Sequence, residues 1–104
     1  MTTNADRRSH ERVKGPFDGS WDGSSGMRTC RVTDLSAGGC FIDRTASPEV
    51  GSSIYVSIQL DGRTFVVPAT VLTDVDRVQG FAVRFTPSEP AEGLAALVNQ
   101  RLAK

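Results

Sequence analysis

The stretch IYVSIQLDGRTFVV, residues 54–67, indicates the fold more directly than any other part of the sequence. Its first seven residues alternate between apolar and other side chains, which is the period of a strand with one buried face. Asp61-Gly62 follows at once and is the strongest short-range signal for a two-residue hairpin turn, because both turn positions must tolerate positive φ. The stretch therefore predicts an antiparallel hairpin formed by residues 54–60 and 63–75.

Further segments extend this pattern to both sides. Four other runs alternate in polarity or are rich in strand-forming residues: residues 13–21, 27–33, 40–43 and 80–86. Six strands with short connections favour a small antiparallel β-barrel, because closure removes the edges that an open sheet exposes. Pro68 interrupts the long 63–75 strand. Since proline has no amide proton to donate, we expect a bulge, a bend or a sheet edge there.

The C-terminal segment has a helical period instead. Ser88 can cap a helix, and Pro90 suits its first turn. Four apolar residues then fall on one helical face: Leu94, Leu97, Val98 and Leu102. The predicted fold class is thus mainly β, a six-stranded antiparallel β-barrel with a C-terminal α-helix packed over one end of the sheet. Trp21 is expected in the core or at the rim of the barrel.

Length and composition predict one domain. The 104 residues have room for a single core, which we place in residues 13–104, after a polar and mobile arm at residues 1–12. A formal net charge of zero argues against a protein that coats DNA or RNA. The sequence shows no signal peptide and no apolar run long enough for membrane insertion. We expect a cytoplasmic protein in which Cys30 and Cys40 stay thiols and bind no metal.

The first of two motifs that carry candidate chemistry is RRSHER, residues 7–12. Arg7, Arg8 and Arg12 offer planar guanidinium donors for phosphate or for the O6/N7 edge of guanine. The first 14 residues hold four basic side chains against two acidic ones, so a local anion site is expected there. Taken alone, the stretch is explained more simply as a solvated tail.

The second motif is DLSAGG, residues 34–39. Asp34 can accept hydrogen bonds from guanine N1–H and N2–H₂, and Ser36 can donate to a phosphate oxygen. Gly38 and Gly39 permit positive φ and let a planar ligand approach the backbone. Taken alone, this stretch is also explained as an ordinary turn in which Asp and Ser cap their own backbone.

Together the two motifs resemble the PilZ domain family, which are bacterial receptors for cyclic di-GMP. R-x-x-x-R is followed by D-x-S-x-x-G, with Asp34 standing 22 positions after Arg12, and GGCFI and GFAVRF continue the likeness along the chain. The resemblance implies a barrel with a C-terminal helix, no catalytic activity, and cyclic di-GMP as ligand without any further cofactor. It also implies the ligand-binding residues: Arg7, Arg8, Arg12, Asp34, Ser36, Gly38 and Gly39.

The resemblance further suggests how ligand and partner are engaged. Arg7, directly before R-x-x-x-R, resembles the pattern that binds two ligand molecules as an intercalated pair. Binding is expected to order the arm and to create a surface for an unidentified downstream protein. Residues 72–76 lack the aromatic side chain that some relatives place against the ligand. Arg84 could reach the ligand, although a plain surface position on its strand is the simpler explanation.

Three alternatives are weighed against this interpretation. The main one is a PilZ-like adaptor that interacts with proteins and does not bind nucleotide. A hydrolase would use His10, Asp34 and Ser36, but no nucleophile elbow frames Ser36. A binder of single-stranded RNA would need several exposed aromatic residues and a basic face, whereas aromatic residues make up only 7% of this sequence.

Overall fold

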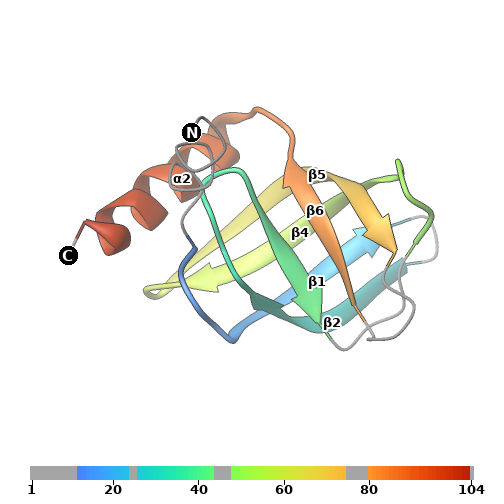
Figure 1. The fold of residues 1–104 in the computed structure, drawn as a ribbon, viewed down its shortest axis with the longest axis horizontal. Helices are drawn as coiled ribbons and strands as arrows, with labels where there is room; N and C mark the ends of the chain where they lie inside the picture. Colours follow the sequence, from blue (N-terminus) through green and yellow to red (C-terminus); the bar gives the residue numbers. More distant parts are fainter. Residues whose placement is uncertain (1–11, 24–25, 44–47, 75–79, 104) are drawn as a thin grey trace, which may run out of the picture.

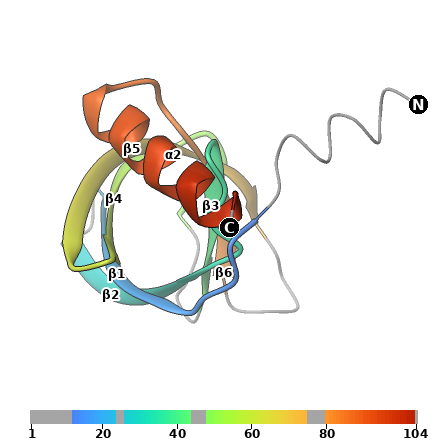
Figure 2. The same cartoon turned by 90° about the vertical axis from the view of Figure 1, so that its left-hand side faces the viewer.

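The chain folds into a closed barrel of six antiparallel strands with a helix across one open end (Figures 1 and 2). The computed structural model describes residues 12–23, 26–43, 48–74 and 80–103. The elements are β1 (Phe17–Gly23), β2 (Gly26–Thr33), β3 (Gly39–Asp43), β4 (Ser53–Leu60), β5 (Arg63–Asp74), β6 (Gly80–Phe85) and α2 (Glu89–Leu102). The predicted fold class is confirmed. Of the predicted arm, only Arg12 lies within the described residues.

The order of strands around the barrel explains how distant motifs meet. Neighbouring strands follow the order β1-β2-β3-β6-β5-β4, and β1 pairs with β4 to close the ring. The last strand, β6, is therefore inserted between β3 and β5 and pairs antiparallel with both. As a result, the segment that follows the 34–39 turn lies directly beside the C-terminal strand.

The β4–β5 hairpin forms where the sequence predicts it. Asp61 and Gly62 have φ values of 54° and 77°, so both turn residues adopt the left-handed region. Leu60 pairs with Arg63 on either side of this turn. The alternating residues of β4 are buried, as their period indicates: Ile54, Val56, Ile58 and Leu60.

The long strand β5 departs from expectation at one point. Pro68 pairs with Tyr55 of β4 without any shift in register. The ladder to β6 runs from Ala69 onward, so Pro68 lies at the end of that ladder, where a missing amide proton is tolerated. The register shift lies instead between Val71 and Thr73, and it proves important for the site.

The first strand begins later than predicted. β1 spans Phe17–Gly23 instead of residues 13–21, and Val13 forms only an isolated bridge with Leu35. Trp21 is a core residue, only 3% exposed, and its ring meets that of Phe81 edge to face with 5.5 Å between centroids. These contacts anchor β1 at its C-terminal half, which is where the sequence has its large aromatic side chain.

Helix α2 closes one end of the barrel. The Ser88 hydroxyl accepts a hydrogen bond from the Ala91 amide at 3.2 Å, which confirms the predicted cap. Leu94 and Val98 are fully buried against the barrel, and Figure 2 shows the helix crossing its opening. Within the described ranges, no helix is long and apolar enough to cross a membrane.

Candidate functional site

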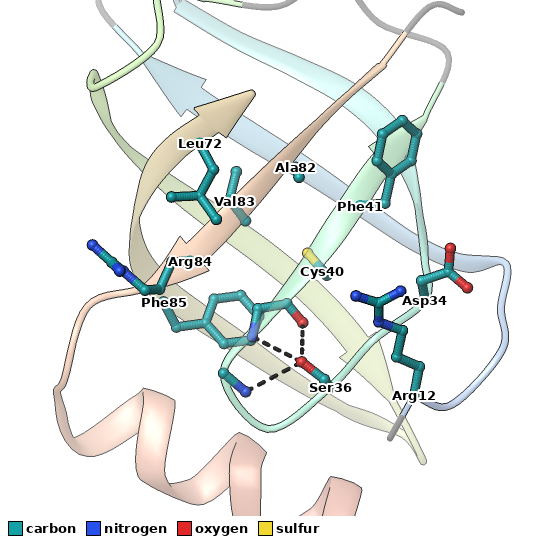
Figure 3. A pocket seen from close by; sticks show the side chains of 12 residues that line it. Arg12, Asp34, Ser36, Cys40, Phe41, Leu72, Ala82, Val83, Arg84 and Phe85 are labelled. Atoms are coloured by element: carbon teal, nitrogen blue, oxygen red, sulfur yellow. Dashed lines mark hydrogen bonds between the residues drawn. The ribbon is translucent and has the colours of Figure 1, made fainter. Parts of the chain in front are cut away.

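A cavity of about 530 Å³ lies on the outer face of the barrel, over the β3–β6 pair and the 34–39 turn (Figure 3). It is bounded by Arg12, by the turn, by residues of β3 and β6, and by Leu72 of β5. Five of the seven residues that sequence reasoning assigns to the ligand line it: Arg12, Asp34, Ser36, Gly38 and Gly39. The remaining two, Arg7 and Arg8, lie outside the described residues.

The backbone bridge between Val13 and Leu35 brings the two motifs together. Each residue donates its amide proton to the carbonyl oxygen of the other, at N–O distances of 2.7 and 2.9 Å. Leu35 is fully buried, so the bridge is anchored in the core. Arg12 directly precedes this bridge, and Figure 3 shows its side chain on the same side of the cavity as Asp34. Among the described residues, no ion pair engages either side chain.

The conformation of the turn is set by Ser36. Its side chain is buried, and its hydroxyl donates to the Gly39 carbonyl at 3.1 Å. The same oxygen accepts from the amides of Gly38 and Gly39 at 3.3 and 3.1 Å. The hydroxyl thus has its one proton and both acceptor positions engaged within the turn. This is the local capping arrangement, while a contact between Ser36 and phosphate stays a prediction.

The two glycines act differently from the prediction. Neither Gly38 nor Gly39 has positive φ; within this motif the left-handed position is taken by Asp34, with φ of 48°. A Cβ at Gly39 would collide with the carbonyl oxygen of Val83, so this glycine lets β6 approach the turn. The Gly38 carbonyl in turn accepts the Phe85 amide at 2.8 Å. Close contact with a neighbouring strand, and not positive φ, therefore explains the glycine at position 39, while the approach of a ligand to Gly38 and Gly39 stays a prediction.

Arg84 supplies a second cation on the opposite rim of the cavity. It pairs with Gly39 of β3 and Thr70 of β5, is exposed, and points outward from the barrel. Figure 3 shows it across the cavity from Arg12. The sequence contained the signal for this placement, since Arg84 alternates with the buried Val83 and Phe85. The sequence does not indicate that Arg84 lies next to the turn, because this depends on the β3–β6 pairing.

The part of the cavity farther from the 34–39 turn is apolar, at the top of Figure 3. Phe41 and Ala82 pair with one another across β3 and β6, and both side chains line the cavity. Leu72 lines the same cavity and is 42% exposed, because the register shift between Val71 and Thr73 makes it the extra residue of β5. Sequence reasoning assigned none of these three to the site.

The two thiols lie close to this region but are chemically quiet. Burial raises the pKa of the Cys30 thiol from 9.0 to about 11. Burial also raises the pKa of Cys40, which lines the cavity, and the neighbouring Cys30 adds to that effect. A raised pKa lowers the thiolate fraction at neutral pH, which makes a cysteine a weaker nucleophile. The described part of the chain holds no cluster of three or more potential metal-ligating side chains.

Comparison with known proteins identifies a family and solved structures that are similar to this chain. The sequence matches the model of the PilZ domain over residues 6–100. The PilZ domain of CeSA from a cellulose-synthesizing bacterium is similar in structure, with a TM-score of 0.71 and 18% identity over 88% of this chain and 97% of that one. The Bacillus subtilis inhibitor of motility (MotI/DgrA) has a TM-score of 0.72 and 17% identity over 93% of this chain and 52% of its own. No curated protein sequence matches this chain.

Proposed function

This chain belongs to the PilZ domain family, and on that premise we propose that it is a receptor for cyclic di-GMP. Domains of this family are generally receptors or adaptors, and not enzymes. The ligand would bind in the cavity on the outer face of the β3–β6 pair. The protein would act in the cytoplasm, without a cofactor or a catalytic step.

The observation that carries the proposal is that Arg12, the last residue of the first motif, and the 34–39 turn line the same cavity. Arg12 and Arg84 lie on opposite rims, and Asp34 stands beside Arg12. Cyclic di-GMP has two anionic phosphates and two guanine bases. Guanidinium groups suit the phosphates and the O6/N7 edge, while a carboxylate suits the N1–H and N2–H₂ donors of guanine.

The anchored position of Val13 also limits how far the remaining arginines can be. Arg8 stands four positions before Arg12, and such a segment spans at most about 14 Å when fully extended. A chain of this length would let Arg7 and Arg8 reach a ligand in the cavity. We propose that they close over the bound nucleotide, and that Arg7 favours an intercalated pair of ligand molecules.

In this proposal the signal passes to a protein partner through the arm. Residues 1–12, once ordered over the ligand, would form a surface that the partner reads. NMR signals of residues 1–12 should change in line width and shift on addition of cyclic di-GMP. Unchanged signals at saturation would contradict arm ordering without contradicting binding.

Isothermal titration calorimetry with cyclic di-GMP tests the binding itself. We expect Arg12→Ala and Arg8→Ala to weaken binding on the order of tenfold or more, because each removes a charge-assisted contact. Arg28→Ala is the matched control: Arg28 is exposed on β2, roughly 20 Å along the strand from Asp34. A ligand-to-protein ratio of two would support the intercalated pair.

The same titration separates the proposal from its main alternative. Absence of heat with a folded protein would contradict the receptor proposal and favour the adaptor that does not bind nucleotide. Equal affinity for the wild type and the Arg12→Ala variant would show that binding takes place elsewhere on the protein.

A further inference from the structure

Phe41 is the single aromatic side chain on the outer face of the β3–β6 pair, where both strands are fully described. It pairs with Ala82 of β6 on one side and with Thr33 of β2 on the other. Its side chain is half-buried and lines the cavity. A large apolar ring partly open to solvent in a binding cavity calls for an explanation beyond core packing, because the core lies on the other face of the strand.

The ring of Phe41 is supported from behind by Gly80. A Cβ placed on Gly80 would lie 2.7 Å from both Cε2 and Cζ of Phe41, which shows that the ring lies over the glycine backbone. Gly80 has φ of 145°, a conformation that other residues rarely adopt. An aromatic side chain packed over a strand glycine is a known way of stabilising a sheet. The ring is therefore held in place before any ligand arrives.

The residues around the Phe41 ring match both the apolar faces and the polar edge of a nucleobase. Ala82 beside it is small, so it leaves room over the strand. Leu72 stands on the far side of the cavity and adds a second apolar wall. Asp34 directly follows Thr33, the residue that pairs with Phe41 across β2 and β3, so the backbones of Asp34 and Phe41 lie close together, and both residues line the cavity. A base is apolar on its faces and polar along its edge, which is the distribution this corner offers.

We infer that Phe41 is a stacking platform for one guanine base of the ligand, and that it fixes the base so that its edge meets Asp34. This inference rests on the proposed function. It assigns a binding role to a residue outside both sequence motifs. Stacking of a base on an aromatic side chain contributes substantially to binding and depends on ring overlap more than on hydrogen bonds.

The test is titration of cyclic di-GMP into Phe41→Leu, with Tyr55→Leu as the matched control. Tyr55 is an aromatic residue on the outer face of β4, 57% exposed and outside the cavity. We expect Phe41→Leu to bind on the order of tenfold more weakly, because leucine keeps the apolar contact and loses the stacking face. Tyr55→Leu should bind as the wild type does, and thermal unfolding should show both variants folded.

A second variant, Phe41→Trp, guards against a purely structural effect of the leucine substitution. The only native tryptophan, Trp21, is 3% exposed in the core, so a change in emission relative to the wild type reports on the new side chain. Quenching of this emission on saturation with cyclic di-GMP is the expected result.

The outcomes are distinct from those that test the proposed function. No binding to the wild-type protein would overturn the receptor proposal and this inference together. Wild-type binding combined with an unchanged affinity of Phe41→Leu, or with an unquenched Phe41→Trp at saturation, would overturn the stacking role alone.

Discussion

Val13 and Leu35 exchange two backbone hydrogen bonds, and this pair closes the base of the β1–β2 hairpin. The chain leaves the site at Val13, runs out along β1, and returns along β2 to Leu35. The spacing of 22 positions between Arg12 and Asp34 therefore corresponds to the length of this hairpin.

Replacing Arg84 should weaken the binding of cyclic di-GMP. Arg84 stands opposite Arg12 across the cavity, so Arg84→Ala removes one of two cationic rims. We expect a loss of affinity of about tenfold and a weaker dependence of affinity on salt, both measurable by calorimetry. The affinity of Arg84→Lys should lie between that of the wild type and that of Arg84→Ala, because lysine keeps the charge and loses the planar donor fork. Wild-type affinity in Arg84→Ala would remove this residue from the site.

Replacing Ser36 should destabilise the fold itself. Ser36→Ala deletes three hydrogen bonds of the turn and leaves the amides of Gly38 and Gly39 without their acceptor. A loss of about 1–3 kcal/mol in the free energy of unfolding is expected, as determined by urea denaturation. Ser53→Ala, at an exposed position at the start of β4, should change stability by less than about 0.5 kcal/mol. Equal stability of both variants would show that the turn does not depend on the hydroxyl.

The same substitution at two glycines should have opposite effects. Gly93 lies inside α2, and a Cβ there would meet Cε2 of Phe65 at an ordinary contact distance of 3.5 Å. Gly93→Ala should therefore stabilise the protein by about 0.5–1 kcal/mol, because alanine has the higher helix propensity. Gly62→Ala should destabilise it, since Gly62 has φ of 77°. Thermal unfolding measures both, and a lower melting temperature for Gly93→Ala would contradict the packing described for α2.

Stability should fall in alkaline solution because of the two thiols. The folded-state pKa of Cys30 is raised from 9.0 to about 11, and that of Cys40 is raised as well. Well below pH 9 the thiols are neutral in both states, so they contribute almost no pH dependence. Above pH 9 they ionise first in the unfolded chain, which stabilises that chain and lowers the free energy of unfolding.

A variant isolates this thiol contribution from other groups that titrate in the same range. Urea midpoints at pH 8 and pH 10 should differ more for the wild type than for Cys40→Ala, each thiol contributing up to about 1.4 kcal/mol per pH unit. Identical pH slopes for the two proteins would show that Cys40 ionises equally well in the folded state.

Local signals in the sequence predicted the elements that depend on local chemistry. The Asp61-Gly62 turn follows from the backbone preferences of its two residues, and the cap of α2 follows from the Ser88 hydroxyl. The start of β1 was misplaced because Val13 pairs with Leu35, a contact between segments far apart in the sequence. Likewise, the register shift near Leu72 arises from pairing with β6 and not from Pro68.

The candidate site was predicted in part for the same reason. Motif spacing identified Arg12 and the turn, which the β1–β2 hairpin brings together. Alternation showed that Phe41 and Arg84 point away from the core, but many outward residues share that property. Phe41 follows the turn directly along β3, but only the insertion of β6 beside β3 brings Arg84 to the turn and Ala82 beside Phe41. The order of strands that are far apart in the sequence cannot be inferred from the composition of either strand.

The alternation of β3 and β6 separates two kinds of mutational freedom. Ile42 and Val83 face the core, while Phe41, Ala82 and Arg84 face outward along the same strands. The outward residues, which would determine ligand specificity, can therefore be substituted with little effect on the inward residues that stabilise the barrel. Libraries that randomise only the outward positions should consist mostly of folded members. The outer face of the β3–β6 pair is therefore a scaffold for sensors of other nucleotides.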